Sequence, residues 1–166
     1  MNNICKLIIV ALLLSACSKE DLQSASERAV LEKKVRNGDT EAQYKLANIN
    51  YIQSKFLDAR ELYEAAAIKN HRKSQIILAI MYADGKGGKK DNIRSYFWSA
   101  IAYGEGATLE DADDSKELNR TVFDKLNLTQ QLRAKNLVKD CTEIKFNLKE
   151  CVKNERYTFS VLPIAP

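Results

Sequence analysis

The chain has 166 residues, with 26 lysines and arginines against 22 aspartates and glutamates, and a formal net charge of +4. This length is enough for one domain with a hydrophobic core. The basic excess is small and no basic block concentrates it, so the composition gives no support to a nucleic-acid-binding protein.

The first sixteen residues have the features of a secretory signal peptide. Lys6 supplies a positive charge, residues 7–14 are continuously apolar, and Ser15 and Ala16 are small residues typical of a cleavage site. An apolar run of this length is too short to span a bilayer as a mature helix. We therefore expect residues 1–16 to be removed, which leaves 166 − 16, or 150, residues in the mature protein.

The sequence "LSAC" that ends at Cys17 resembles the bacterial lipobox. The resemblance implies that cleavage follows Ala16, that Cys17 receives a diacylglyceryl group, and that its new amino group is acylated. Several acyl chains on one residue anchor a protein stably, and residues 17–27 would form the tether. Ser18 stands where an aspartate would favour the inner membrane, which points to the outer membrane, facing the periplasm. The alternative is an ordinary signal peptide followed by an incidental cysteine.

Two of the four cysteines are left for the folded part of the chain. Cys5 leaves with the signal peptide and Cys17 carries the lipid, which leaves Cys141 and Cys151. In an oxidising periplasm we expect these two to form a disulfide, worth about 2–3 kcal/mol in the chain-entropy model. A metal site is the competing interpretation, but the single histidine, His71, lies far upstream, so no metal is expected.

The apolar residues follow a helical spacing through most of the chain, and both prolines lie at its extreme C-terminus. We therefore predict an all-α fold. The first helices are expected over residues 28–36, 41–53 and 58–69. Asp39 or Thr40 is expected to cap the second of them, and Asn70 is expected to end the third in the left-handed conformation.

The helix pair over residues 41–70 is followed by a second pair with the same pattern. Leu78 aligns with Leu46 at an offset of 78 − 46 = 32, and Trp98 aligns with Leu62 at an offset of 98 − 62 = 36. The difference between the two offsets places a four-residue insertion in the turn "DGKGGKKD". A period in the thirties that contains two helices predicts an α-solenoid of antiparallel helix pairs.

The second pair resembles the Sel-one-like repeat, a relative of the tetratricopeptide repeat. The residues that match its pattern in order are Leu78, Ala79, Tyr82, Gly85, Gly87, Asp91, Arg94, Ser95, Trp98, Ala102 and Gly106. Ala79 replaces the usual glycine, Gly88 the usual valine, and Arg94-Ser95 the usual lysine-alanine. The first pair is more degenerate and lacks the glycine turn. The resemblance implies two repeats with a leading helix over residues 28–106, in a class of proteins that bind other proteins.

Residues 107–140 are predicted to form a third helix pair that caps the open end of the second repeat, as solenoids require. Thr108 and Thr129 are the expected N-caps. The apolar residues expected to cover the repeat are Leu118, Val122, Phe123, Leu126, Leu132, Leu137 and Val138. The disulfide would close residues 141–166 onto this cap, with an extended tail either packed or binding a partner. Whether residues 107–140 form a true third repeat stays open.

Enzyme motifs are missing from the sequence. The glycine-rich turn lacks the GxxxxGK[ST] pattern and no strand precedes it, so a flexible turn between helices accounts for its glycines. The "DADDSKE" segment starts like a calcium loop, but Lys116 and Val122 stand where glycine and glutamate are needed. His71 is expected to cap the carbonyls of the preceding helix. Since no GxSxG, HExxH or SxxK motif occurs, we assign no catalytic residue and no cofactor.

A binding surface is the remaining candidate site. The concave side of a solenoid is built from the first helix of each unit. The side chains expected there are Tyr44, Lys45, Asn48, Tyr51, Gln75 and Met81, with Tyr44 or Tyr51 alternatively in the core. The sequence thus predicts a non-catalytic lipoprotein scaffold or adaptor with a protein partner. The family resemblance leaves two alternatives, an immunity protein that neutralises a secreted toxic effector and a cell-envelope hydrolase.

Overall fold

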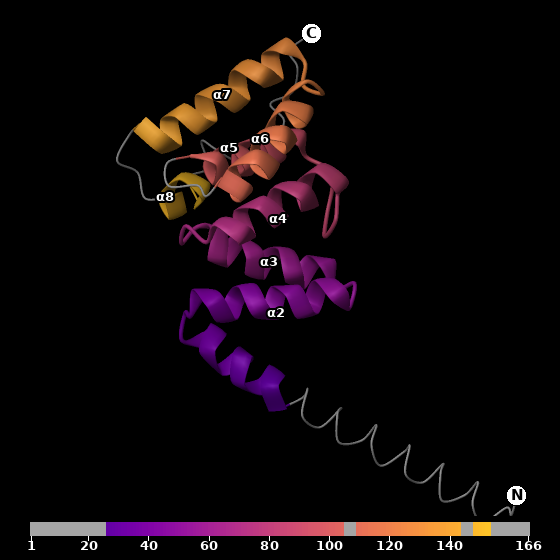
Figure 1. The fold of residues 1–166 in the computed structure, drawn as a ribbon, viewed down its shortest axis with the longest axis vertical. Coiled ribbons are helices and arrows are strands. Elements are labelled where there is room, and N and C mark those ends of the chain that lie inside the picture. The colour runs from indigo at the N-terminus through magenta and orange to yellow at the C-terminus, as the bar shows by residue number, and fades with distance from the viewer. Residues whose placement is uncertain (1–25, 105–108, 144–147, 154–166) are drawn as a thin grey trace, which may run out of the picture.

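The computed structural model describes residues 26–104, 109–143 and 148–153, which form helices joined by turns (Figure 1). After a leading helix at 26–36 come α2 (Thr40–Ile52), α3 (Phe56–Ala67), α4 (Arg72–Asp84), α5 (Asn92–Tyr103), α6 (Leu109–Phe123), α7 (Leu128–Glu143) and α8 (Leu148–Lys153). The all-α prediction is therefore confirmed for this part of the chain. The signal peptide, Cys17, Gly106, Thr108 and the tail after residue 153 lie outside the described residues.

The helices pack on one another largely in chain order, from the leading helix at one end of the molecule to α7 at the other (Figure 1). α2 packs on α3, α3 on α4 and α4 on α5, while α6 and α7 both contact α5. The leading helix runs back along α2, because Arg28 near its start donates a 3.1 Å hydrogen bond to Asn50 near the end of α2. Each helix therefore covers the apolar side of its neighbour.

Side-chain caps explain where several helices begin. Asp39 accepts a 2.8 Å hydrogen bond from the amide of Ala42 at the start of α2, as one of the two predicted caps. Asn127 caps α7, since its side chain and that of Gln130 each bond the other's backbone amide, at 2.9 and 3.0 Å. The prediction that Thr129 caps this helix is wrong, because Thr129 is already its second residue.

His71 serves both of the helices that it joins. Its backbone amide donates a 3.2 Å hydrogen bond to the carbonyl of Ala66 at the end of α3, as predicted, and at the N-cap of α4 its ring nitrogen Nδ1 accepts a 3.2 Å hydrogen bond from the amide of Ser74. Asn70 ends the turn between the two helices with φ of 63°, as expected of a residue that tolerates the left-handed conformation. The linker is so short that the residue after Asn70 already serves the next helix.

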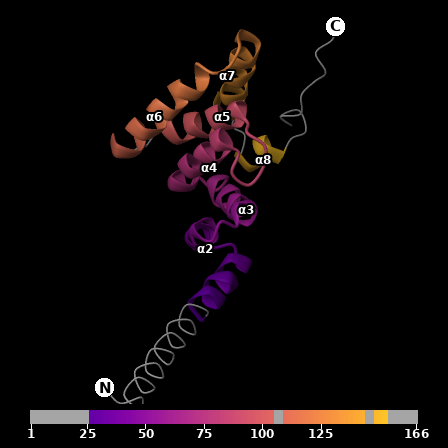
Figure 2. The same cartoon turned by 90° about the vertical axis from the view of Figure 1, so that its right-hand side faces the viewer.

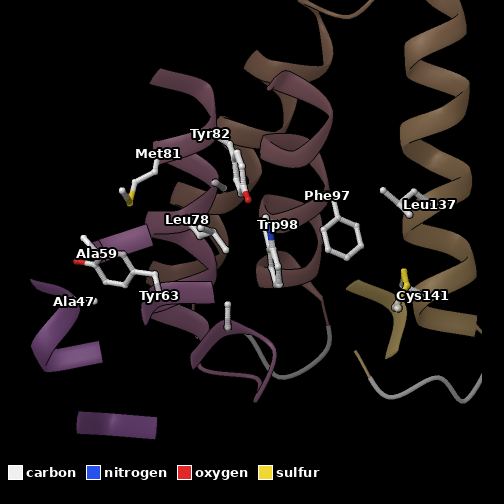
Figure 3. Packing of buried hydrophobic residues seen from close by; sticks show 13 residues of the cluster. Ala47, Ala59, Tyr63, Leu78, Met81, Tyr82, Phe97, Trp98, Leu137 and Cys141 are labelled. Atoms are coloured by element: carbon white, nitrogen blue, oxygen red, sulfur yellow. A yellow bond between two sulfur atoms is a disulfide. The ribbon is translucent and has the colours of Figure 1, made fainter. Parts of the chain in front are cut away.

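The core lies between α3, α4 and α5 and extends to α7 and α8 (Figure 3). Its largest members are Trp98, Phe97 and Tyr63, each at most 2% exposed. Trp98 lies between Leu78 on α4 and Phe97, whose ring centroid is 5.1 Å from that of Trp98 (Figure 3). Fully buried alanines let the helices approach closely, at Ala47, Ala59, Ala66, Ala67, Ala79 and Ala102.

The glycine-rich turn between α4 and α5 folds over the turn between α2 and α3. Gly85 ends α4 in the left-handed conformation with φ of 76°. Gly87 has φ of 77°, and a Cβ atom there would lie 2.5 Å from the carbonyl oxygen of Phe56. Lys86 donates a 2.6 Å hydrogen bond to the hydroxyl of Tyr51, with Nζ 4.9 Å from the centre of that ring. The glycines thus allow a close approach between two helix pairs.

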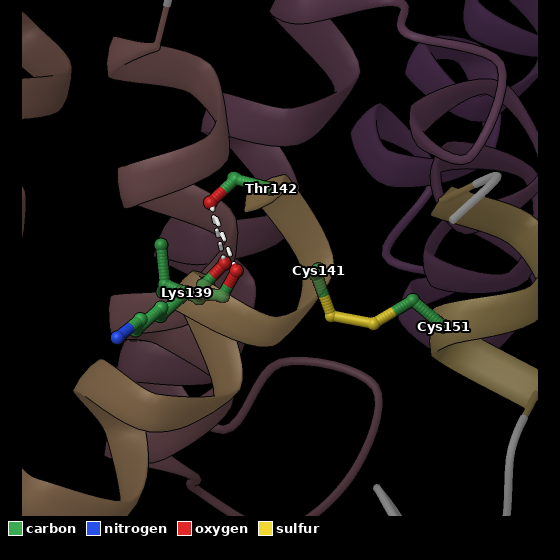
Figure 4. The surroundings of a disulfide bond; sticks show 5 residues. Lys139, Cys141, Thr142 and Cys151 are labelled. Carbon is green, nitrogen blue, oxygen red and sulfur yellow. Dashed lines mark hydrogen bonds between the residues drawn. A yellow bond between two sulfur atoms is a disulfide. The ribbon is translucent and has the colours of Figure 1, made fainter. Parts of the chain in front are cut away.

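The C-terminal helix α8 is joined to α7 by a disulfide between Cys141 and Cys151 (Figure 4). Both cysteines are buried, and their Cα atoms lie 5.8 Å apart, within the usual range for this bond. Near Cys141, Thr142 donates to the carbonyl of Val138 at 2.9 Å in the last turn of α7. The cross-link holds α8 against the core.

The apolar residues predicted to cover the second repeat are only partly in place. Val122, Leu126 and Leu137 are buried, and Leu118 and Val138 pack against the core. Phe123 is half-buried, with its ring centroid 5.1 Å from that of Tyr96. Leu132, however, is 61% exposed, so its predicted place in the cover is wrong. The apolar stripe of α7 is wider than the side that its neighbours cover.

Candidate protein-binding face

The first helices of the two predicted repeats, α2 and α4, run parallel, and both pack on α3. Tyr44 near the start of α2 stacks on His71 at the start of α4, with ring centroids 4.6 Å apart. Tyr51 near the end of α2 is bonded to Lys86, just beyond the end of α4. These contacts link the two helices at both ends, and we call their outer sides together the α2/α4 face.

Four of the six predicted binding residues lie on this face. Lys45 is exposed, while Tyr44, Asn48 and Tyr51 are half-buried between the helices. The tyrosines are therefore neither core residues nor free side chains. Each packs partly against the core and keeps part of its side chain open to solvent.

The other two predicted binding residues are wrong. Gln75 is 3% exposed, and its amide donates a 3.0 Å hydrogen bond to the carbonyl of Ala67 at the end of α3. Met81 is fully buried in the core between α4 and its neighbours. Neither side chain is available to a partner, because both point toward α3 rather than along the outer side of α4.

The residues of α4 that do lie on the face are isoleucines, and the sequence contained the signal for them. The repeat offset of 32 carries Tyr44, Lys45 and Asn48 onto Ile76, Ile77 and Ile80. In the structure Ile76 and Ile77 are half-buried and Ile80 is 39% exposed. Applying the offset to each position chosen on the first helix would have found them. The α2/α4 face is thus defined by Tyr44, Lys45, Asn48, Tyr51, Ile76, Ile77 and Ile80.

Beneath the face, Tyr63 of α3 links the two half-buried tyrosines. Its ring centroid is 6.2 Å from that of Tyr44 and 6.5 Å from that of Tyr51. Tyr63 is 1% exposed, and its hydroxyl donates a 2.5 Å hydrogen bond to the carbonyl oxygen of Asn48. Burial raises the pKa of Tyr63 far above its ordinary value, so the hydroxyl stays a donor at neutral pH. The bond goes to the side-chain oxygen Oδ1 and orients the Asn48 side chain from below.

Charged groups flank the face at both ends. At one end Glu41 lies 3.6 Å from Lys45 and 3.4 Å from the Nε2 atom of His71. At the other end, the hydrogen bond to Tyr51 raises the pKa of Lys86 and keeps the ammonium group charged. Exposed ion pairs of this kind contribute little to folding stability. Their charges are therefore available to orient a partner.

In residues 26–104, 109–143 and 148–153, no group of three or more histidine, cysteine, aspartate or glutamate side chains is arranged to hold a metal ion. Within the same part of the chain, none of the helices combines the length and the apolar character needed to cross a membrane.

Comparison with protein-family models gives no match for this chain, and neither the curated proteins nor the solved structures contain a match.

Proposed function

We propose that this chain is a bacterial cell-envelope lipoprotein, anchored through Cys17, that binds another protein on its α2/α4 face and has no catalytic activity of its own. The observation that carries the proposal is the composition of that face. It brings tyrosines and isoleucines together on a rigid pair of helices and places charges at both ends. Aromatic and aliphatic side chains inside a polar rim are typical of protein-binding surfaces.

The proposal includes a short α-solenoid of Sel-one-like repeats with α6 and α7 as the cap. Three features support it. The first helices of the two units run parallel, the glycines at 85 and 87 both have positive φ, and the signature residues Leu78, Tyr82 and Trp98 are all buried. In this arrangement the glycine turn positions one repeat on the next.

The face is tested by replacing Ile80 with glutamate. A charge at the centre of an apolar contact should reduce capture of the partner roughly tenfold or more, because truncating or charging a central residue removes most of the local binding energy. The measurement is affinity capture from solubilised cell-envelope membranes, with the captured protein identified by mass spectrometry.

Leu132→Glu is the matched control, because Leu132 is also an exposed apolar residue but lies on α7, away from the α2/α4 face. A partner retained by the native chain and by Leu132→Glu but lost from Ile80→Glu supports the face. Equal capture by both variants contradicts it. The identity of a specifically captured protein also separates a scaffold, which would retain envelope-assembly proteins, from an immunity protein, which would retain one toxin.

The anchor is tested separately by replacing Cys17 with serine. Without the thiol no diacylglyceryl group can be attached, so the protein is expected to leave the membrane fraction and to lose metabolic labelling with palmitate. Fractionation and labelling of cells that express each form provide the measurement. A Cys17→Ser protein that still carries label would contradict the lipobox prediction.

A further inference from the structure

One side of the row of helices carries an exposed apolar patch beside lysines that form no ion pair within the described residues. The patch consists of Ile52, at the end of α2, and Leu57, in the first turn of α3. Ile52 is 81% exposed and Leu57 is 53% exposed. Neither is part of the α2/α4 face, whose apolar residues lie along the helices rather than at their ends. The two side chains flank the turn between α2 and α3.

The glycine-rich turn between α4 and α5 lies on the same side of the row of helices. Gly87 packs on Phe56, which is the residue before Leu57, so the turn between α4 and α5 rests directly on the turn between α2 and α3. Its lysines Lys89 and Lys90 are exposed, as is Lys55 in the neighbouring turn. Within the described residues these three lysines form no ion pair. We call Ile52, Lys55, Leu57, Lys89 and Lys90 the turn edge.

The carboxylates near the turn edge are mostly engaged. Asp84 lies 4.0 Å from Lys86, and Asp91 lies 3.6 Å from Arg94 while also accepting hydrogen bonds from two backbone amides of α5. Asp58 is exposed in the first turn of α3, where the helix dipole compensates part of its charge. The edge therefore presents a positive surface around its apolar side chains.

The topology places the N-terminal tether at this edge. Arg28, near the start of the leading helix, is bonded to Asn50 near the end of α2, so the leading helix begins beside the turn edge. Figure 1 shows the start of the leading helix and both turns on the same side of the molecule, and this side faces the viewer in Figure 2. Cys17 is 26 − 17 = 9 residues before Ser26. Nine residues reach about 30 Å at most, so a lipid on Cys17 keeps this side near the bilayer.

We propose that the turn edge is a membrane-contact surface that docks on anionic lipid, with Ile52 and Leu57 entering the headgroup region and the lysines binding lipid phosphates. Apolar side chains surrounded by lysines are the composition of surfaces that lie on anionic bilayers. Docking through this edge lays the row of helices along the bilayer, with the turns after α2 and α4 toward it, and leaves the α2/α4 face open to the periplasm. The placement of the turn edge against the bilayer rests on the lipid anchor of the proposed function. The affinity of the edge for anionic lipid does not depend on that anchor.

The test places a tryptophan in the turn edge. The full-length processed protein is reconstituted into phosphatidylglycerol vesicles that contain lipids brominated near the headgroup. In Ile52→Trp the new indole should lose roughly half of its emission or more, since contact surfaces of this kind bury about 5–10 Å into the headgroup boundary. Leu128→Trp is the matched control, because Leu128 is 82% exposed on α7, far from the edge. Trp98, 2% exposed, is common to both variants and serves as the reference.

A blue-shifted, quenched signal at position 52 but not at position 128 supports the proposal. Protein that floats with the vesicles while position 52 stays unquenched overturns it. Equal quenching in neutral phosphatidylcholine vesicles overturns the anionic preference, as does quenching that survives in Lys89→Gln/Lys90→Gln. If the mass of the processed protein shows that it carries no lipid, the anchor has failed. The edge should then still bind anionic vesicles at low salt and be released at about 0.5 M salt, where charges are screened beyond a few ångströms, and failure to bind refutes the edge alone.

Discussion

Replacing Gly87 with alanine is expected to lower the free energy of unfolding by about 3 kcal/mol. Two effects contribute to this loss. The left-handed backbone conformation costs an ordinary residue about 1–2 kcal/mol, and steric overlap of the new side chain costs about 1–3 kcal/mol. The overlap arises because the new Cβ atom would lie 2.5 Å from the carbonyl oxygen of Phe56. That oxygen belongs to the backbone of α3, so relief requires the turn or the helix to shift. Urea unfolding followed by circular dichroism measures the loss.

Gly38→Ala separates the two effects. Gly38 has φ of +81°, close to that of Gly87, but a Cβ atom there would meet only the flexible side chain of Lys69, at 3.6 Å. This variant should show the backbone cost alone, about 1 kcal/mol. If both glycine variants lose the same stability, the close packing of the turn on α3 is not present in solution. A greater loss at Gly87 ties the glycine turn to the contact between the two helix pairs.

The all-α fold and the helix positions followed from the sequence because they depend on local patterns. The helical spacing of the apolar residues predicted where the described helices lie. Short polar residues such as Asp39 and Asn70 indicated where those helices begin or end. The same local reasoning failed at Thr129 and missed the second role of His71 as the N-cap of α4, because caps depend on how tightly two helices are joined. In a short linker, the residue after one helix already belongs to the next.

The candidate face was harder to predict, because burial on a helix changes from one residue to the next. Gln75 and Met81 each lie one position away from outward-facing isoleucines, and that single position separates the core from solvent. The repeat offset contained the missing information for Ile76 and Ile80. The contact of Lys86 with Tyr51 had no such signal, since it depends on the path of a turn over a different helix pair.

Replacing Trp98 with alanine is expected to have the largest effect on stability, a loss of about 3–5 kcal/mol. Trp98 is 2% exposed and packs between α4 and Phe97, so the truncation removes its buried surface and leaves a cavity that rigid helices fill poorly. A loss of this size approaches the total stability of about 5–15 kcal/mol of a typical domain. Because Trp98 is the only tryptophan in the chain, unfolding of the variant is followed by circular dichroism rather than by fluorescence.

Tyr103→Ala is the control for Trp98→Ala on the same helix. Tyr103 is 47% exposed at the end of α5, so its removal should change the free energy of unfolding by about 0.5 kcal/mol or less. A large difference between the two variants supports Trp98 as the residue that joins α4 to α5. Equal, small changes would place Trp98 on the surface, remove the main support for the repeat proposal, and make Trp98 itself a candidate for partner binding. The two variants therefore test the fold of the second helix pair and the position of the binding face together.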